Sequence, residues 1–217
     1  GNWTLSETRQ TPSLDTIHTL AFDFDGVFTD NSVWIDDQGG ESVRCDRADG
    51  LAFDMLRAAQ LRGLLDVETL IVSSENNAVV AHRARKLRID CHQGVGDKLA
   101  FMRKHLSERF PNNSDPFAGL IFLGNDLNDL ALMRAAGFSV APSDADERVL
   151  KVASLILDRP GGNGFVRLFV ECMLGIHKLN SDEIDEFVFS SVTKYKDFSF
   201  KSINHSDAMA ELQSKED

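Results

Sequence analysis

Two acidic residues follow an apolar run near the start of the chain, and their spacing suits the binding of a cation. Residues 18–24 read HTLAFDF, a pattern typical of a buried strand, and Asp23 and Asp25 lie at its end. Side chains two residues apart in an extended chain point to the same side, and Gly26 lets the backbone turn away directly afterwards. Two carboxylates on one buried face are costly unless a cation binds between them. Taken alone, the motif also fits a simple strand end and turn.

Further polar side chains follow other predicted strands or begin predicted helices. The run LIFL at 120–123 is followed by GNDLND, the run TLIVS at 69–73 is followed by Ser74 and Glu75, and Lys98 begins a helical segment. Each of these could singly be a helix cap or a solvated side chain. Together they would meet at one edge, because the carboxyl ends of parallel strands lie on the same side of a sheet. The sequence therefore predicts a site of hydroxyl, ammonium and carboxylate groups at that edge.

The order of the apolar segments predicts an α/β fold. Helical periodicity is clearest over 165–176, where apolar residues recur at i, i+3, i+4 and i+7. Strands that alternate with helices of ten or more residues indicate a mainly parallel sheet with helices on both faces. Buried strands are expected at 18–24, 69–73, 89–92, 120–123, 138–141 and 154–157.

Two segments depart from this alternation. Residues 32–45 contain two strand-like runs around Asp37-Gln38-Gly39-Gly40, which is a hairpin signal, and we expect this hairpin to serve assembly. Beyond Lys178 the pattern decays, and we interpret the rest as a short helix followed by a weakly ordered segment. The predicted organisation is an N-terminal extension over 1–15, one domain without an inserted cap over 16–178, and a tail over 179–217.

The composition is that of a globular protein with an acidic surface. The chain has 217 residues, 42% of them hydrophobic, and a formal net charge of −11, which disfavours nucleic acid and anionic membranes as partners. No apolar run approaches the roughly 18 to 20 residues needed to span a bilayer. The three cysteines, Cys45, Cys91 and Cys172, lack the spacing of a zinc site or disulfide framework and suit a reducing compartment. We therefore expect a cytoplasmic protein.

The motifs together resemble those of the haloacid dehalogenase superfamily, which are DxD, a Ser or Thr after the second strand, a Lys and a terminal acidic cluster. The match runs from about Leu20 to Cys172. The resemblance extends to one branch, the capless sugar-acid phosphatases that act on 3-deoxy-octulosonate 8-phosphate or on nonulosonate (sialic-acid-type) 9-phosphates. The same module is similar to the C-terminal part of some acylneuraminate cytidylyltransferases. The segments that carry the branch resemblance are DGVFTD, 47–50 (RADG), 93–94, 97–98, GNDLND and 161–164.

The resemblance and the chemistry imply a Mg²⁺-dependent phosphomonoester hydrolase with a Rossmann-like core. Asp23 would attack phosphorus and form an aspartyl phosphate, and Asp25 would act as general acid and then general base. The side chain of Asp23, the carbonyl of Asp25 and the side chain of Asn125 would hold Mg²⁺. The commonest motif has Asp directly after Gly124 where this chain has Asn125, so Mg²⁺ binding is expected to be weaker.

Other polar residues are expected to bind the phosphate or to orient the metal ligands. Ser73 and Lys98 would hold the non-transferred phosphate oxygens, and Ser74 takes the place of Ser73 if the strand register shifts by one residue. Asp126 and Asp129 would orient the metal ligands, the waters and the lysine.

The substrate assignment depends on residues after the second strand. Glu75, Arg83 and Lys86 resemble the sugar-contacting residues of nonulosonate phosphatases, and the two cations one turn apart could bind the carboxylate of a 2-keto sugar acid. A solvated basic helix face explains Arg83 and Lys86 equally well. The alternatives are a 3-deoxy-octulosonate 8-phosphate phosphatase and a non-catalytic tetramerisation module.

A capless site needs another source of shielding from water, and the resemblance implies a homotetramer whose neighbouring subunits close it. Residues 161–164 and Arg167 would contribute from the next subunit, although Leu168 stands where the family usually has Glu. The expected partners are a phosphorylated small sugar acid and further copies of the chain.

Overall fold

A central sheet runs through the molecule in the computed structural model, which describes residues 3–5, 11–192 and 202–205. Its eight strands lie in the order β1-β9-β8-β7-β2-β5-β6-β10, and every neighbouring pair is parallel except β1 with β9. The strands are β1 Trp3–Leu5, β2 Thr19–Phe22, β5 Glu68–Val72, β6 Asp90–Gln93, β7 Leu120–Leu123, β8 Phe138–Pro142, β9 Leu155–Leu157 and β10 Ser202–Asn204.

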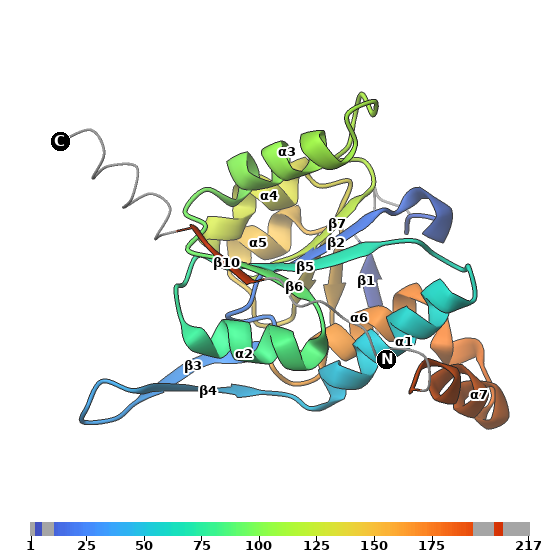
Figure 1. Cartoon of the computed structure of the whole chain (residues 1–217), viewed down its shortest axis with the longest axis horizontal. Coiled ribbons are helices and arrows are strands. Elements are labelled where there is room, and N and C mark those ends of the chain that lie inside the picture. Colours follow the sequence, from blue (N-terminus) through green and yellow to red (C-terminus); the bar gives the residue numbers. More distant parts are fainter. Residues whose placement is uncertain (1–2, 6–10, 193–201, 206–217) are drawn as a thin grey trace.

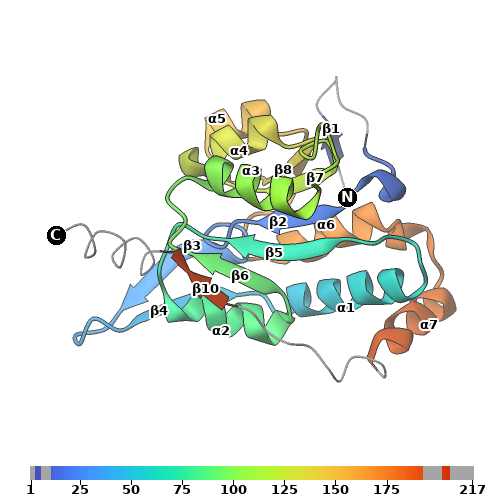
Figure 2. The same cartoon turned by 45° about the horizontal axis from the view of Figure 1, so that its top comes forward.

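Helices cover both faces of this sheet, as Figures 1 and 2 show. One face carries α1 Ala48–Leu61, α2 Ala78–Leu87, α6 Phe165–Met173 and α7 Ser181–Val192. The other face carries α3 Lys98–Arg109, α4 Leu130–Ala135 and α5 Glu147–Val152. Short 3-10 helices lie at Leu14–Thr16, Leu127–Asp129 and Ile176–Lys178. The predicted α/β class with a mainly parallel sheet is confirmed.

The central strand β2 shows why an unbroken apolar run forms this sheet. All four of its residues are buried, because helices cover both faces. Leu20 and Phe22 belong to the hydrophobic cluster on the α1 side, whereas Ala21 belongs to the cluster on the α3 side. Phe22 packs against Phe28 and Phe53 with ring centroids 5.6 Å apart in both pairs. Burying each such ring stabilises the fold by roughly 1.5–3 kcal/mol and fixes the strand end that carries Asp23.

The predicted hairpin is present and forms a sheet of its own. β3 Thr29–Ile35 pairs antiparallel with β4 Glu41–Cys45, and the hairpin projects from the body in Figure 1. Asp36 closes its turn, because its Oδ1 accepts hydrogen bonds from the backbone N–H groups of Gln38 and Gly40. The role of the hairpin in assembly stays a prediction.

Both ends of the chain contribute more to the sheet than predicted. β1 extends the sheet from the segment 1–15, and β10 extends it from the tail, so the limits of 16–178 exclude two strands that pair with the domain. The helix predicted after Lys178 is confirmed as α7. The segment predicted to be weakly ordered lies largely outside the described residues, except for 202–205. Within the described ranges, no helix combines the length and the apolar character that a membrane crossing requires.

Candidate active site at the carboxyl ends of the strands

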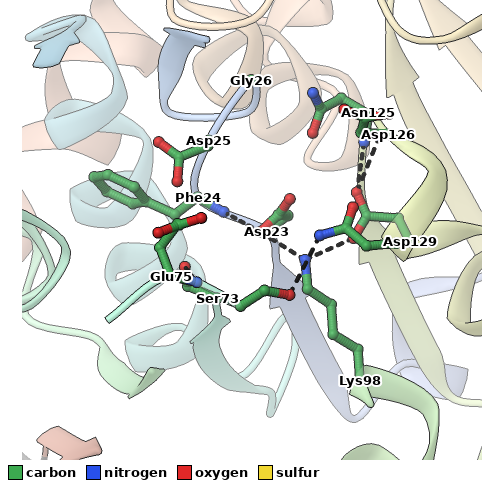
Figure 3. A network of polar contacts seen from close by, with 12 residues as sticks. Asp23, Phe24, Asp25, Gly26, Ser73, Glu75, Lys98, Asn125, Asp126 and Asp129 are labelled. Carbon is green, nitrogen blue, oxygen red and sulfur yellow. Dashed lines mark hydrogen bonds and ion pairs between the residues drawn. The ribbon is translucent and has the colours of Figure 1, made fainter. Parts of the chain in front are cut away.

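Three neighbouring strands end beside one another at the predicted site. β7, β2 and β5 are adjacent in the sheet, and Asn125, Asp23 and Ser73 follow them closely. Lys98 is the first residue of α3 and reaches the same place (Figure 3). The edge predicted from the sequence therefore brings together the residues assigned to chemistry.

Asp23 is buried and is held from several sides. Its backbone N–H donates to the carbonyl of Leu123, which links β2 to β7. Its Oδ1 accepts from the N–H of Phe24 at 2.7 Å and lies 2.7 Å from Nζ of Lys98. Only 5% of Asp23 is exposed, and burial raises the pKa of its carboxyl to about 7 against the opposing charge of Lys98.

Lys98 joins Asp23 to the loop that carries Asn125. Its Nζ contacts Oδ1 of Asp129 at 2.7 Å, and although burial disfavours its charge, the two carboxylates raise its pKa. Oδ2 of Asp129 accepts from the N–H groups of Asn125 and Asp126 at 2.9 and 3.2 Å. Asp129 is thus placed to orient both the lysine and the loop, while Asp126 caps the following 3-10 helix.

Asn125 has the surroundings expected of a metal ligand. Its side-chain Oδ1 is buried and accepts no hydrogen bond within the described part of the chain. The side chain packs so closely on Gly26 that a Cβ there would collide with it. Figure 3 shows Asp23, Asp25 and Asn125 around one space. A buried amide oxygen without a donor is costly, and a hard cation that prefers oxygen ligands would satisfy it.

The donor set suits Mg²⁺ better than a softer metal. One carboxylate, one backbone carbonyl and one amide oxygen would take part, and a small hard cation keeps several waters besides such ligands. Across the described residues, no group of three or more His, Cys, Asp or Glu side chains could hold a metal ion. The predicted metal site therefore consists of oxygen donors, of which the carbonyl of Asp25 and the amide of Asn125 are neutral.

A cavity of about 160 Å³ opens at these strand ends. Ser73 is buried at its wall, and its Oγ accepts from the N–H of Glu75 at 3.1 Å. Ser74 also borders the cavity, and its Oγ accepts from the side-chain amide of Asn128 at 3.2 Å. Both hydroxyls stay candidates for the phosphate. The lining consists of Asp23, Asp25, Asn31, Ser73, Ser74, Glu75, Asn125, Asp126 and Asn128.

Asp25 borders this cavity beside the nucleophile candidate. Its carboxyl is partly buried and accepts a long hydrogen bond from Oγ1 of Thr29 at 3.5 Å. Burial, followed by the nearby carboxylate of Glu75, raises its pKa, while the charge of Lys98 opposes the shift. A carboxyl that keeps its proton more readily is suited to donate it to a leaving group.

The predicted carboxylate-binding residues are not brought together with this cavity. Glu75 lies at its rim, but Arg83 donates to the backbone carbonyl of Asp46 at 2.6 Å, and Lys86 is exposed. The physical reason is the direction of α2, whose start at Asn77 borders the site and whose later turns lead away. Six residues of helix place Arg83 about 9 Å further along the axis.

The glycine-rich segment 161–164 packs on the turn after Asp25 within the same chain. The N–H of Gly162 donates to the carbonyl of Val27 at 3.1 Å. Arg167, which was predicted to act in a neighbouring subunit, pairs with Glu171 at 2.7 Å, and its N–H donates to Asp49 at 3.0 Å. These contacts support the turn from within, and a contribution to another subunit stays a prediction.

Several residues at the site were missed in the sequence. Asn31 and Asn128 line the cavity, and Glu41 and Asn77 lie close by in an adjoining one. Asn77 precedes a helical pattern and could have been recognised as an N-cap. Nothing in the local pattern around Glu41 indicated that the hairpin borders the site.

Comparison with known proteins agrees with this geometry. Residues 116–169 match the model of the haloacid dehalogenase-like hydrolases. The chain is 28% identical over 159 residues, 73% of its length and 80% of the relative's, to the 3-deoxy-D-manno-octulosonate 8-phosphate phosphatase KdsC of Yersinia pestis. Two solved structures are similar over most of their length.

The first is described as a HAD family hydrolase of Streptomyces avermitilis, with 34% identity, a TM-score of 0.67, and coverage of 76% of this chain and 96% of that one. The second is the 3-deoxy-D-manno-octulosonate 8-phosphate phosphatase of Moraxella catarrhalis in complex with magnesium, phosphate and KDO. It has 27% identity and a TM-score of 0.67, and the match covers 82% of this chain and 95% of that one. The chain therefore belongs to the haloacid dehalogenase family of hydrolases.

Proposed function

We propose that this chain is a Mg²⁺-dependent phosphomonoester hydrolase that uses Asp23 as its nucleophile. The observation that carries the proposal is a buried carboxylate at a strand end, held 2.7 Å from Lys98 and bordering the same cavity as Asn125, whose Oδ1 has no hydrogen-bond partner among the described residues. This arrangement places a nucleophile, a cation and an oxygen ligand around a space open to a phosphate group.

The reaction divides into two displacements at phosphorus. An Asp23 oxygen forms a bond to phosphorus while the ester P–O bond breaks, and Asp25 donates a proton to the departing oxygen. Asp25 then takes a proton from the water that attacks the aspartyl phosphate, which releases inorganic phosphate and restores Asp23. Two contacts occupy Lys98 Nζ, so its third N–H and the hydroxyl of Ser73 or Ser74 remain to hold phosphate oxygens.

The side chain of Asp23, the backbone carbonyl of Asp25 and the amide oxygen of Asn125 would hold the magnesium ion. When bound, the ion supplies the positive charge that lets an anionic nucleophile approach an anionic phosphate. Asp129 would keep Lys98 and the backbone of Asn125 in place, since it contacts both.

The substrate class that we propose is a phosphorylated sugar acid. The named relatives act on 3-deoxy-D-manno-octulosonate 8-phosphate, which supports an eight-carbon substrate. Glu75, which resembles a sugar-contacting residue of the nonulosonate phosphatases and lies at the cavity rim, is the feature that supports a nonulosonate 9-phosphate. Comparison of kcat/KM for the eight-carbon and the nine-carbon ester decides which of them is the substrate.

We also propose that the active form is a homotetramer. No inserted cap covers the cavity within the described residues, and the hairpin exposes three consecutive apolar side chains, Val33, Trp34 and Ile35. Burial of that surface between subunits would both remove an aggregation hazard and shield the site.

The decisive experiment measures phosphate release from a panel of sugar phosphates with and without Mg²⁺. Asp23→Asn keeps the shape of the side chain but is not nucleophilic, so we expect a loss of more than a hundredfold with an unchanged fold by circular dichroism. Retention of more than about a hundredth of the activity in Asp23→Asn, or full activity after exhaustive chelation, would refute the mechanism.

A further inference from the structure

A second cavity of about 270 Å³ adjoins the one that contains Asp23. The two cavities share Asp25, Asn31 and Glu75. The remaining walls come from the segment after β2, from the two strands of the hairpin and from the start of α2, and they comprise Phe24, Ser32, Val33, Glu41, Val43, Asn77, Val79 and Val80. A phosphate ester attacked by Asp23 would extend its alcohol portion past Asp25, and this second cavity is the space beyond that residue.

Glu41 is held in place at the wall of this cavity. The side-chain amide of Asn77 donates to Oε2 of Glu41 at 2.6 Å, which connects the hairpin to α2. Asn77 is itself fixed, because its Oδ1 accepts from the N–H of Val79 at 3.0 Å and its own N–H donates to Oε1 of Gln93 at 3.1 Å. The carboxylate of Glu41 is therefore positioned by the fold, although its surface is open to solvent.

The second cavity carries a concentration of negative charge. Asp25, Glu41 and Glu75 all line it, and Figure 3 shows the carboxylates of Asp25 and Glu75 on the same side of the site. None of the described residues that line either cavity is Lys, Arg or His. The closest buried cation at the site, Lys98, is 2% exposed and is shared between Asp23 and Asp129.

This charge distribution selects between chemical groups on the substrate. Carboxylates accept hydrogen bonds from hydroxyl groups and repel other anions, most strongly where the wall is partly shielded from water. Val43, Val79 and Val80, which are partly or fully buried, provide that shielding on the apolar side of the cavity. An alcohol with hydroxyl groups near the ester oxygen fits this cavity. A carboxylate at the same place would lie close to the carboxylates of Glu41 and Glu75, and also to that of Asp25 when Asp25 is ionised.

Building on the proposed function, we propose that Glu41 determines specificity at the leaving-group end of the site. With Glu75 it forms a cavity that accepts a hydroxylated carbon chain next to the ester oxygen and rejects a carboxylate within the first three carbons. A sugar acid phosphorylated on its last carbon meets this requirement, because its carboxylate lies at the other end of the carbon chain.

The test compares two esters that share a three-carbon skeleton. Glycerol 3-phosphate ends in a hydroxymethyl group where 3-phosphoglycerate has a carboxylate. We expect kcat/KM of the wild type to favour glycerol 3-phosphate by at least tenfold. Glu41→Gln should lower this ratio three- to tenfold, mainly through faster turnover of 3-phosphoglycerate, because one repulsive charge is removed while the acceptor for Asn77 is kept.

A matched control separates local charge from net charge. Asp37 is an exposed acid on the same hairpin and lines neither cavity, so Asp37→Asn removes the same charge and should leave the ratio unchanged. High salt should reduce the ratio of the wild type more than that of Glu41→Gln, which a purely structural role for Glu41 would not produce.

The outcomes distinguish this inference from the function on which it rests. No discrimination by the wild type, or equal effects of Glu41→Gln on both esters while para-nitrophenyl phosphate is still hydrolysed, overturns the role of Glu41 alone. Absence of metal-dependent phosphate release from any ester, including para-nitrophenyl phosphate, overturns the proposed function and this inference together.

Discussion

At the scale of single residues, the site is organised around a buried lysine between two acids. Lys98 contacts Asp23 and Asp129 at 2.7 Å each, and all three side chains are almost wholly removed from solvent. Desolvating such a group costs several kcal/mol per ion, and mutual attraction offsets that cost only while every partner is present. When both carboxyls are ionised the trio carries one surplus negative charge, which a bound cation would balance.

The side-chain oxygen of Asn125 gives a prediction about metal affinity. Asn125→Asp adds a formal charge at the proposed ligand, so we expect tighter Mg²⁺ binding by isothermal titration calorimetry, by about tenfold or more. Asn128→Asp adds the same charge to the same cavity without a ligand role and should change affinity much less. Unchanged or weaker binding by Asn125→Asp would show that Asn125 does not contact the metal.

Asp49 gives a prediction about the pH dependence of stability. It is fully buried, its Oδ2 has no hydrogen-bond partner in the described structure, and burial raises the pKa of its carboxyl from 3.8 to about 7. The folded state thus keeps the proton up to about pH 7, whereas the unfolded chain releases it near pH 4. The free energy of unfolding consequently falls as pH rises through this window and levels off above it.

Asp49→Asn removes this titration but keeps an acceptor for the N–H of Arg167. We expect the loss of stability between pH 5 and pH 7 to shrink by about 2 to 3 kcal/mol in urea unfolding, since one pKa unit corresponds to about 1.4 kcal/mol. Identical pH profiles for the variant and the wild type would mean that Asp49 is ionised in the folded protein throughout this range.

At the scale of elements, two loops are locked together beneath the site. Gly162 has φ +63°, and a Cβ at this position would collide with the backbone of Thr29 and Asp30, which follow the Asp23–Gly26 motif. The start of α6 is capped from another helix, because Gly164 has no side chain and Asp49 of α1 accepts from the N–H of Arg167 instead. The position of the motif therefore depends on contacts from a segment more than a hundred residues away.

Gly162→Ala should separate close packing from backbone strain. We expect the free energy of unfolding, measured in urea, to fall by about 3 kcal/mol or more. Activity should also fall, because the Asp23–Gly26 motif is displaced. Gly63→Ala is the control, since Gly63 has φ +68° but open space around it. This variant should lower the free energy of unfolding by only about 1 kcal/mol. Similar losses for the two variants would argue against a tight contact at Gly162.

At the scale of the whole molecule, the projecting hairpin is the feature that a monomer leaves unexplained. Val33, Trp34 and Ile35 are 50%, 55% and 66% exposed, and they lie next to one another on β3. Three large apolar side chains on a two-stranded ribbon are an aggregation liability unless a partner covers them. The same ribbon carries Glu41 at the second cavity, so the proposed assembly and the proposed substrate selection involve one element.

We expect sedimentation velocity to show a tetramer at micromolar concentration. Trp34→Glu should shift the chain towards monomers, because it places a charge in the apolar surface that would be buried. Activity on sugar phosphates should fall with dissociation, whereas Asp37→Asn on the same hairpin should leave the tetramer intact. A monomeric wild type with full activity would contradict both the assembly and the shielding of the site by neighbours.

The sequence by itself determined the layers of the fold and the edge at which the site lies. The apolar runs that became β2, β5 and β7 are buried on both faces, so their pattern is local and strong. The residues that end them follow directly in the chain, which is why Asp23, Asp25, Ser73 and Asn125 could be expected at one edge. The hairpin and the helix after Lys178 were also indicated by local patterns.

The tertiary structure alone decided the contacts between residues that are distant in the chain. β1 and β10 are three-residue strands, too short for a periodic signal, and they form by pairing with an existing sheet edge. Arg83 contacts the carbonyl of Asp46, and Glu41 meets Asn77, because packing of the hairpin on α2 sets their directions. Side-chain direction and charge partners depend on what the folded chain brings alongside, which local periodicity does not encode.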